Sequence, residues 1–236
     1  MINRDLIEKA AALIIEAVGE NPCREGLVKT PTRIASMYEE FLSCSDQDPS
    51  EPLSTSFEES HGGMVVLKDI PFYSICEHHF LPFHGKASIG YLPNGRVVGL
   101  SKLARTLDII ASRPQLQERL TQQFADVIQE SLNPKGVGVI VSAEHMCLSL
   151  RGARKPGSKL VTSASRGMIQ NDTATQQEFD RMLQVIWQWQ PPSTLVIFLI
   201  LNRHGKTSFP NAIPLQYSSP MYGSVCGGNA SALIQI

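Results

Sequence analysis

The chain has 236 residues, which is enough for one substantial hydrophobic core or two small ones. Its hydrophobic fraction of 42% and charged fraction of 18% are those of an ordinary globular protein. The formal net charge of −1 argues against nucleic-acid binding driven by bulk charge.

Cysteine use and terminal composition indicate the compartment. Five scattered cysteines, an odd number in a chain that needs no covalent staples, are typical of a reducing compartment and of metal or catalytic use. The polar stretch 1–5 lacks the apolar core of a signal peptide. The longest apolar run, 195–201, is too short to span a bilayer as a helix. We therefore expect a cytoplasmic protein with no nucleic-acid or membrane partner.

The first 62 residues are predicted to be a helical region. The spacing predicts a helix over 4–18 that Gly19 ends, with an apolar stripe of Leu6, Ala10, Leu13, Ile14 and Ala17. A second helix is predicted to begin with Thr30 as its cap and Pro31 in the first turn, burying Ile34, Met37, Tyr38 and Phe41. Residues 44–62 read as a surface connection because they are rich in polar residues, Pro and Gly.

Residues 63–184 are predicted to form a catalytic domain with strands and helices in blocks. Strands are expected at 64–67, 72–75, 86–91 and 96–100, with 93–95 as a hairpin turn between the last two. Helices should begin at Ser101 and near Pro114, followed by a β pair at 137–142 and 145–151. A further strand at 159–163 and a helix at 173–184, capped by Thr173, complete the pattern. This block order predicts an α+β fold with an antiparallel sheet.

Residues 185–236 differ in composition from the rest of the chain. They contain no Asp or Glu, and only Arg203 and Lys206 are basic. We expect an atypical, poorly ordered tail with one β-prone run at 195–201.

Four consecutive residues, Cys76-Glu77-His78-His79, carry the densest chemistry in the chain. Cys76 and His79 have the spacing Cys-x-x-His, and thiolate and imidazole are ligands that zinc prefers. The best third ligand is Cys147 in the segment 144–147, which also offers the imidazole of His145. Three protein ligands leave a fourth position open for water, as in catalytic zinc sites. The alternative is that both cysteines are buried free thiols, but the clustered carboxylate and imidazoles favour a site.

Basic and amide side chains suggest a nucleotide ligand. Ser101, Lys102 and Arg105 lie in the first turns of a predicted helix, and helix N-termini attract anions. Arg151 is a further fork-shaped donor suited to phosphate. The alternative is a solvated helix face. The chain has no P-loop, so charge and helix ends would hold any polyphosphate. Gln117 and Glu118 need no functional explanation as surface residues, although a carboxylate can accept from the edge of a guanine.

Several segments together resemble GTP cyclohydrolase I. They are 76–79, 99–105, 113–121, 144–147 and 151–152, and the resemblance runs in order from about residue 4 to about residue 184. It implies a tunnelling-type fold, in which helices back an antiparallel sheet, and a toroidal homodecamer with active sites between subunits. It also implies conversion of GTP and water to formate and 7,8-dihydroneopterin triphosphate, the first step of folate or tetrahydropterin synthesis.

The resemblance also implies roles for individual residues. Zinc falls on Cys76, His79 and Cys147, and proton transfer on His78 and His145. The remaining residues would bind substrate: the triphosphate near Ser101, Lys102, Arg105 and Arg151, the guanine at Gln117 and Glu118, and a further phosphate contact at Arg33.

Two other functions fit parts of the pattern. A purine- or pterin-binding protein with a structural zinc is disfavoured because both histidines stand beside three metal ligands rather than four. The nitrile reductase of queuosine synthesis shares the implied fold but uses a lone nucleophilic cysteine and a nicotinamide cofactor. The Cys-x-x-His spacing at 76–79 disfavours that enzyme.

Overall fold

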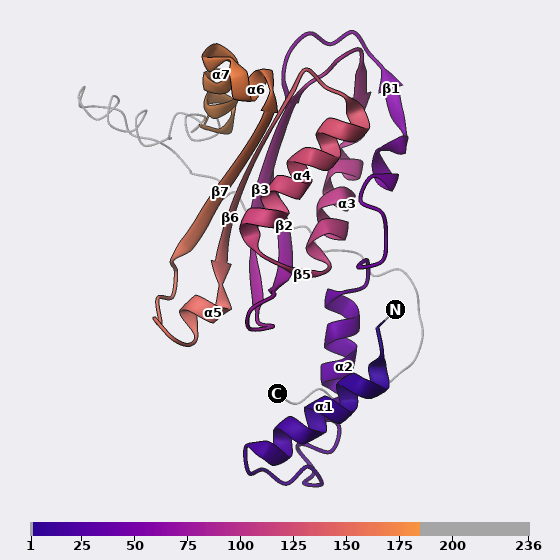
Figure 1. The fold of residues 1–236 in the computed structure, drawn as a ribbon, viewed down its shortest axis with the longest axis vertical. Coiled ribbons are helices and arrows are strands. Elements are labelled where there is room, and N and C mark those ends of the chain that lie inside the picture. The colour runs from indigo at the N-terminus through magenta and orange to yellow at the C-terminus, as the bar shows by residue number, and fades with distance from the viewer. Residues whose placement is uncertain (1, 185–236) are drawn as a thin grey trace, which may run out of the picture. The chain divides into compact units, whose positions relative to one another are not determined.

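A computed structural model of the chain describes residues 2–184 (Figure 1). The helices are α1 (Arg4–Ala17), α2 (Thr30–Phe41), α3 (Leu100–Ala111), α4 (Gln117–Leu132), α5 (Met146–Ser149), α6 (Met168–Asn171) and α7 (Thr173–Gln184), with a 3₁₀ turn, η1 (Glu51–Ser54). The strands are β1 (Ser56–Glu58), β2 (Val65–Cys76), β3 (Pro82–Leu92), β4 (Arg96–Val98), β5 (Pro114–Gln115), β6 (Gly136–His145) and β7 (Lys159–Gly167).

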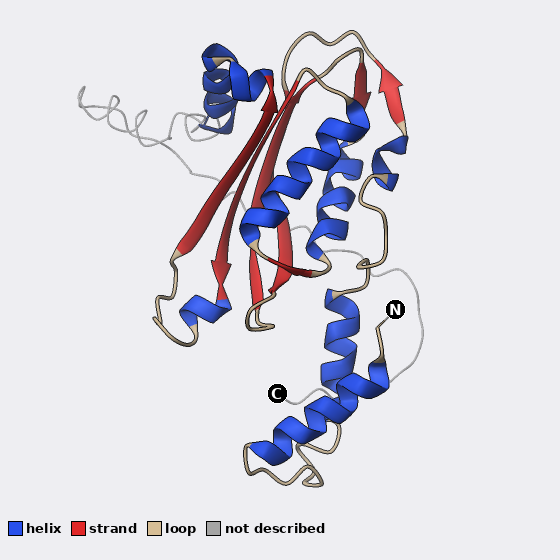
Figure 2. Cartoon of the chain, in the orientation of Figure 1, coloured by secondary structure: helices blue, strands red, loops and turns tan. Residues whose placement is uncertain are grey.

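The main sheet has the strand order β5-β2-β3-β6-β7, and only the short β5 runs parallel to its neighbour (Figure 2). The predicted α+β class with an antiparallel sheet is therefore confirmed. The predicted strands 64–67 and 72–75 form one strand, β2, whose pairing with β3 shifts register between Leu67 and Ile70.

The two faces of this sheet are covered differently because successive side chains in a strand point to opposite faces. Helices α3 and α4 pack on one face and bury the main core, which includes Leu107, Phe124 and Val139. On the opposite face, Phe179 of α7 lies over Gly90 and Gly138, where an added Cβ would come within 3 Å of its ring. These two glycines therefore let α7 approach the sheet closely.

The hairpin predicted across 93–95 is wrong. Strand β3 pairs with β2 and β6, whereas β4 pairs with β1 in a separate two-stranded sheet. The segment 44–62 is consequently more than a connection, because it contributes η1 and β1. The turn still exists, with Gly95 at φ +78°, but it passes the chain to a different sheet.

The β pair predicted from 137–142 and 145–151 is also wrong. Strand β6 extends to His145, and the next residues form the helical turn α5. The short apolar run over 146–148 resembles a strand, but the Ser149 hydroxyl donates to the His145 carbonyl four residues back, as in a helix. Strand β6 instead pairs with β3 on one side and β7 on the other, and β7 confirms the further strand predicted at 159–163.

The N-terminal helices occur as predicted, but the faces expected to be buried do not match. In α1 the buried residues are Ala11 and Ile15, whereas Leu6, Leu13 and Ile14 are 60–64% exposed. In α2 only Ala35 is buried. Most residues of the predicted apolar stripes, but not Leu13, Ala17 or Phe41, instead line an open apolar cavity of about 530 Å³. Its lining is Leu6, Ile7, Ala10, Ala11, Ile14, Ile34, Met37, Tyr38, Leu42 and Phe80.

Three predicted helix starts need correction. Lys29 rather than Thr30 occupies the cap position of α2, with no side-chain cap bond. The Asp172 carboxylate, not Thr173, caps α7 by accepting from the Thr175 backbone N–H at 2.9 Å. Residues 114–115 form β5 before α4 begins, because they pair with the end of β2.

The predicted tail at 185–236 lies outside the described residues, and the predicted division at 62/63 stays a prediction. No helix in the described part of the chain is long and apolar enough to cross a membrane.

Candidate metal and active site

Cys76 is held at the end of β2 by the turn that leads into β3. Its backbone N–H donates to Leu81 O at 2.9 Å, and its carbonyl accepts from the Phe80 N–H at 2.8 Å. Phe80 closes the turn with φ +52°, an uncommon backbone conformation for a residue other than glycine. The turn thus presents Cys76 and His79 on the same side of the β2–β3 connection.

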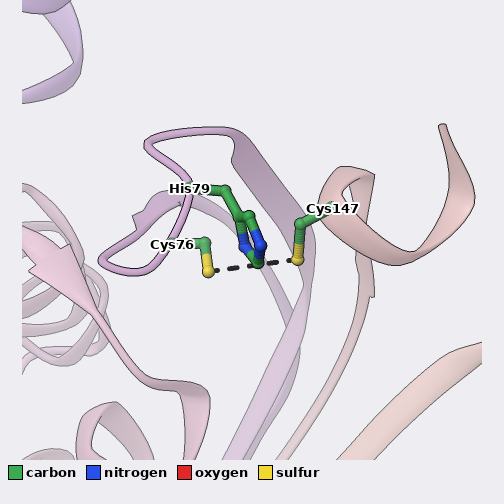
Figure 3. Close-up of side chains that lie close together, drawn as sticks. All are labelled: Cys76, His79 and Cys147. Atoms are coloured by element: carbon green, nitrogen blue, oxygen red, sulfur yellow. Dashed lines mark hydrogen bonds between the residues drawn. The ribbon is translucent and has the colours of Figure 1, made fainter. Parts of the chain in front are cut away.

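The third candidate ligand comes from α5, directly after β6. Cys147 Sγ lies 3.9 Å from Cys76 Sγ, and one ligand atom from each of Cys76, His79 and Cys147 lies within 4.8 Å of the others (Figure 3). Two sulfurs bound to one tetrahedral zinc at ~2.3 Å would stand about 3.8 Å apart. The sulfur separation therefore fits a zinc ion, and neither cysteine forms a disulfide.

The environment of the cluster affects both thiol and imidazole. Burial, and secondarily the neighbouring Cys76, raises the pKa of the Cys147 thiol. Arg151 Nη1 lies 2.9 Å from His79 Nε2 and, because guanidinium groups only donate, this ring nitrogen accepts. A zinc ion bound to His79 Nε2 would use the lone pair that now accepts from Arg151. A zinc ion bound to His79 Nδ1 would leave Nε2 carrying a hydrogen, so that it could no longer accept. Either mode breaks the hydrogen bond and frees Arg151.

Strand β5 brings the start of α4 to this cluster, because Gln115 pairs with Cys76 in register. Gln117 Oε1 lies 2.8 Å from His145 Nε2, and the His145 ring stacks on Phe83 with centroids 4.4 Å apart and planes 3° apart. Burial lowers the pKa of His145, and the nearby Glu118 charge opposes that shift. The structure therefore joins the metal candidates, His145, Gln117 and Glu118 at one end of the sheet. His78 is exposed, with its ring centroid 6.2 Å from that of His79.

One ion pair at this end was not predicted from the sequence. Arg119 donates to the two Glu77 carboxylate oxygens at 2.5 and 3.2 Å, and this bond lowers the pKa of Glu77. The ion pair connects the turn between β2 and β3, which carries Cys76 and His79, to the first turn of α4. The sequence indicates this pair only by the opposite charges of Glu77, in the segment 76–79, and Arg119, in the segment 113–121.

Of the predicted triphosphate residues, Arg151 lies beside His79, whereas the others lie elsewhere. Ser101, Lys102 and Arg105 stand near the start of α3, whereas its last residue, Ala111, accepts a hydrogen bond from Ser74, close to Cys76. Ala111 lies nine positions after Lys102 in the helix, a rise of about 14 Å.

A cavity of about 560 Å³ is lined in part by Lys102 and Arg105, but by no member of the Cys76–His79–Cys147 cluster. Arg33 is exposed in the first turn of α2, and within 2–184 no side-chain hydrogen bond joins it to another candidate residue. The described chain does not bring these basic residues to the metal cluster.

An open Cys2His cluster beside a second histidine and a carboxylate is typical of a metal-dependent hydrolase. The family model for GTP cyclohydrolase I matches residues 7–184. GTP cyclohydrolase 1 of Pelotomaculum thermopropionicum is 58% identical over 179 residues, which are 75% of this chain and 95% of that protein. GTP cyclohydrolase 1 of Streptococcus agalactiae is 52% identical over 185 residues, 78% of this chain and 99% of that protein. The chain therefore belongs to the GTP cyclohydrolase I family and is an enzyme of that kind.

A solved structure, the archaeosine synthase QueF-Like in the apo form, is a much weaker match. It is 21% identical with a TM-score of 0.37, over 46% of this chain and 97% of that chain. A likeness of this strength adds nothing to the assignment.

Proposed function

We propose that the protein catalyses the zinc-dependent hydrolysis and ring rearrangement of GTP to formate and 7,8-dihydroneopterin triphosphate, on a tunnelling-type fold in the cytoplasm. The observation that supports this most strongly is the cluster of Cys76, His79 and Cys147 with zinc-compatible spacing, next to His145. The family assignment makes GTP the substrate to consider first.

The residues around the cluster can perform the proton and positioning steps. Cys76, His79 and Cys147 would hold zinc through two thiolates and one imidazole, and the ion would supply a water activated for attack on an electrophilic carbon. His145 donates a proton to the purine ring, and His78, which is exposed beside the cluster, moves protons as the ring opens. The exposed Glu118 carboxylate accepts N–H groups from the guanine edge and so orients the base.

We propose further that the active site is shared between copies of the chain, in a homo-oligomer expected to be a decamer. In such a shared site, one copy would supply the metal cluster and Arg151. Another copy would bind the triphosphate beside them with Ser101, Lys102, Arg105 and Arg33. Two observations support this: Lys102 and Arg105 lie far from the cluster within one chain, and α1 and α2 leave a large apolar surface uncovered. Helix ends and arginine forks suit a triphosphate.

The test is incubation of purified full-length protein with GTP, measuring formate and the fluorescence of the oxidised pterin product. We expect both products from the wild type. His78→Ala should retain zinc but lose turnover, because it removes a proton carrier that is not a ligand. GTP binding without formate from the zinc-loaded wild type would contradict the proposal and favour a purine-binding protein.

A further inference from the structure

The side chain of Gln117 is buried, with only 1% of the residue exposed, and its amide nitrogen faces the sheet. Nε2 lies 3.0 Å from Leu160 O and 3.2 Å from Val141 O. Backbone carbonyl oxygens can only accept hydrogen bonds, so the atom facing them must be the nitrogen and not the oxygen of the amide. The orientation of the amide is therefore fixed by its partners.

The opposite side of the amide fixes His145. Gln117 Oε1 lies 2.8 Å from His145 Nε2, and an amide oxygen can only accept. His145 must consequently carry a hydrogen on Nε2 to make this bond. Stacking on Phe83 holds the plane of the ring. The remaining ring nitrogen, Nδ1, is then the one that can exchange a proton with a bound molecule.

Two threonines complete the support of the Gln117 side chain. Thr121 Oγ1 donates to the Gln117 backbone carbonyl at 2.7 Å, so its lone pairs are free to accept from the Thr162 hydroxyl at 2.6 Å. Thr162 Oγ1 in turn accepts from Gln117 Nε2 at 3.1 Å. Gln117 Nε2 therefore has three acceptors for its two hydrogens, namely Leu160 O, Val141 O and Thr162 Oγ1. Both donors of the amide nitrogen are thus engaged with β6 and β7, and none is left for a base.

We propose that Gln117 is a positioning residue that holds His145 in the tautomer protonated on Nε2, and that it does not read the guanine base. The proposal rests on the function proposed above, because it assigns Gln117 to the support of His145, whose Nδ1 must first take up a proton before it can pass one to the purine ring. It replaces the role that the family resemblance implies for Gln117 and leaves Glu118 as the side chain that binds guanine.

The kinetic test compares Gln117→Met with Glu118→Gln in the zinc-loaded full-length protein. Met has a similar length but no amide, so kcat for formate release should fall by about 10–100-fold, as for other residues that orient catalytic groups, while KM for GTP changes by less than about twofold. Glu118→Gln should raise KM. A rise in KM at unchanged kcat for Gln117→Met would overturn the proposal. An inactive wild type would instead contradict the proposed function.

A second measurement does not depend on activity or on a variant that folds. Neutron diffraction from deuterium-exchanged wild-type crystals should show deuterium on His145 Nε2, facing Gln117 Oε1. Nε2 without deuterium, or an amide turned with its nitrogen towards His145, would overturn the proposal even if the enzyme is active.

Discussion

At the scale of single residues, the two thiols of the cluster determine how zinc affinity depends on pH. Zinc binds thiolates, whereas burial and Cys76 raise the pKa of the Cys147 thiol, so zinc must displace its proton. The apparent affinity should therefore increase with pH, by about tenfold per unit for each proton displaced. Competition with a chromophoric chelator across neutral pH measures this. An affinity that is independent of pH would contradict thiol ligation.

The ion pair between Glu77 and Arg119 gives a second pH-dependent prediction. Its stabilisation is present above the unfolded-state pKa of Glu77 and is lost as pH falls through the lowered folded-state pKa. Arg119→Gln should therefore lower Tm slightly at neutral pH in metal-free protein. The difference from wild type should disappear in acid, because Glu77 is then protonated in both proteins.

The effect should be small since Arg119 is 44% and Glu77 30% exposed. Arg181→Gln is the matched control, because the Arg181 side chain bonds only the Gln177 carbonyl in the described structure. A Tm difference between wild type and Arg119→Gln that persists unchanged in acid would contradict the assigned role of the pair.

At the scale of elements, α7 buries the aromatic ring of Phe179 against the main sheet. Phe179 is 4% exposed and packs over Gly90 and Gly138. Phe179→Ala should lower the free energy of unfolding by about 3–5 kcal/mol, measured by urea denaturation. Phe57→Ala is a suitable control because Phe57 is 58% exposed. Equal losses in the two variants would show that α7 does not stabilise the sheet through Phe179.

Helices whose apolar residues recur at helical spacing over several turns could be predicted from the sequence, whereas the shortest strands could not. Leu103, Leu107 and Ile110 in α3, and Leu120, Phe124 and Ile128 in α4, are buried as their spacing predicts. Strands β1 and β5 have three and two residues, too few for a period, and exist because β4 and β2 offer unpaired edges.

The cluster of Cys76, His79 and Cys147 was predictable for a related reason. Cys76 and His79 are close in sequence, and Cys147 was a rare residue type in a second motif rich in the same chemistry. The hydrogen bonds of Gln117 were not predictable, because they depend on the register of β6 and β7 with α4. The exposed stripes on α1 and α2 show the limit of periodicity, which finds an apolar face but not what covers it.

At the scale of the whole molecule, the separation of Lys102 and Arg105 from the cluster predicts complementation between inactive variants. Lys102→Ala and Cys147→Ser should each be inactive alone. Mixed assemblies made by co-expression should recover about a quarter of the wild-type sites, since a shared site needs one intact face from each of two copies. Formate release by the copurified mixture measures the recovery. Activity no higher than that of either variant alone would place the whole site within one chain.

We propose that Cys76, His79 and Cys147 bind the zinc ion on which formate release from GTP depends, because their ligand atoms lie within 4.8 Å of one another. The most direct measurement determines zinc content and formate release from GTP in the same preparations of wild type and Cys147→Ser. We predict about one zinc per chain and formate release in the wild type, and loss of both in the variant, because two ligands hold zinc poorly. Retention of both by Cys147→Ser would contradict zinc binding by Cys147, and a zinc-loaded wild type that releases no formate would contradict the proposed reaction.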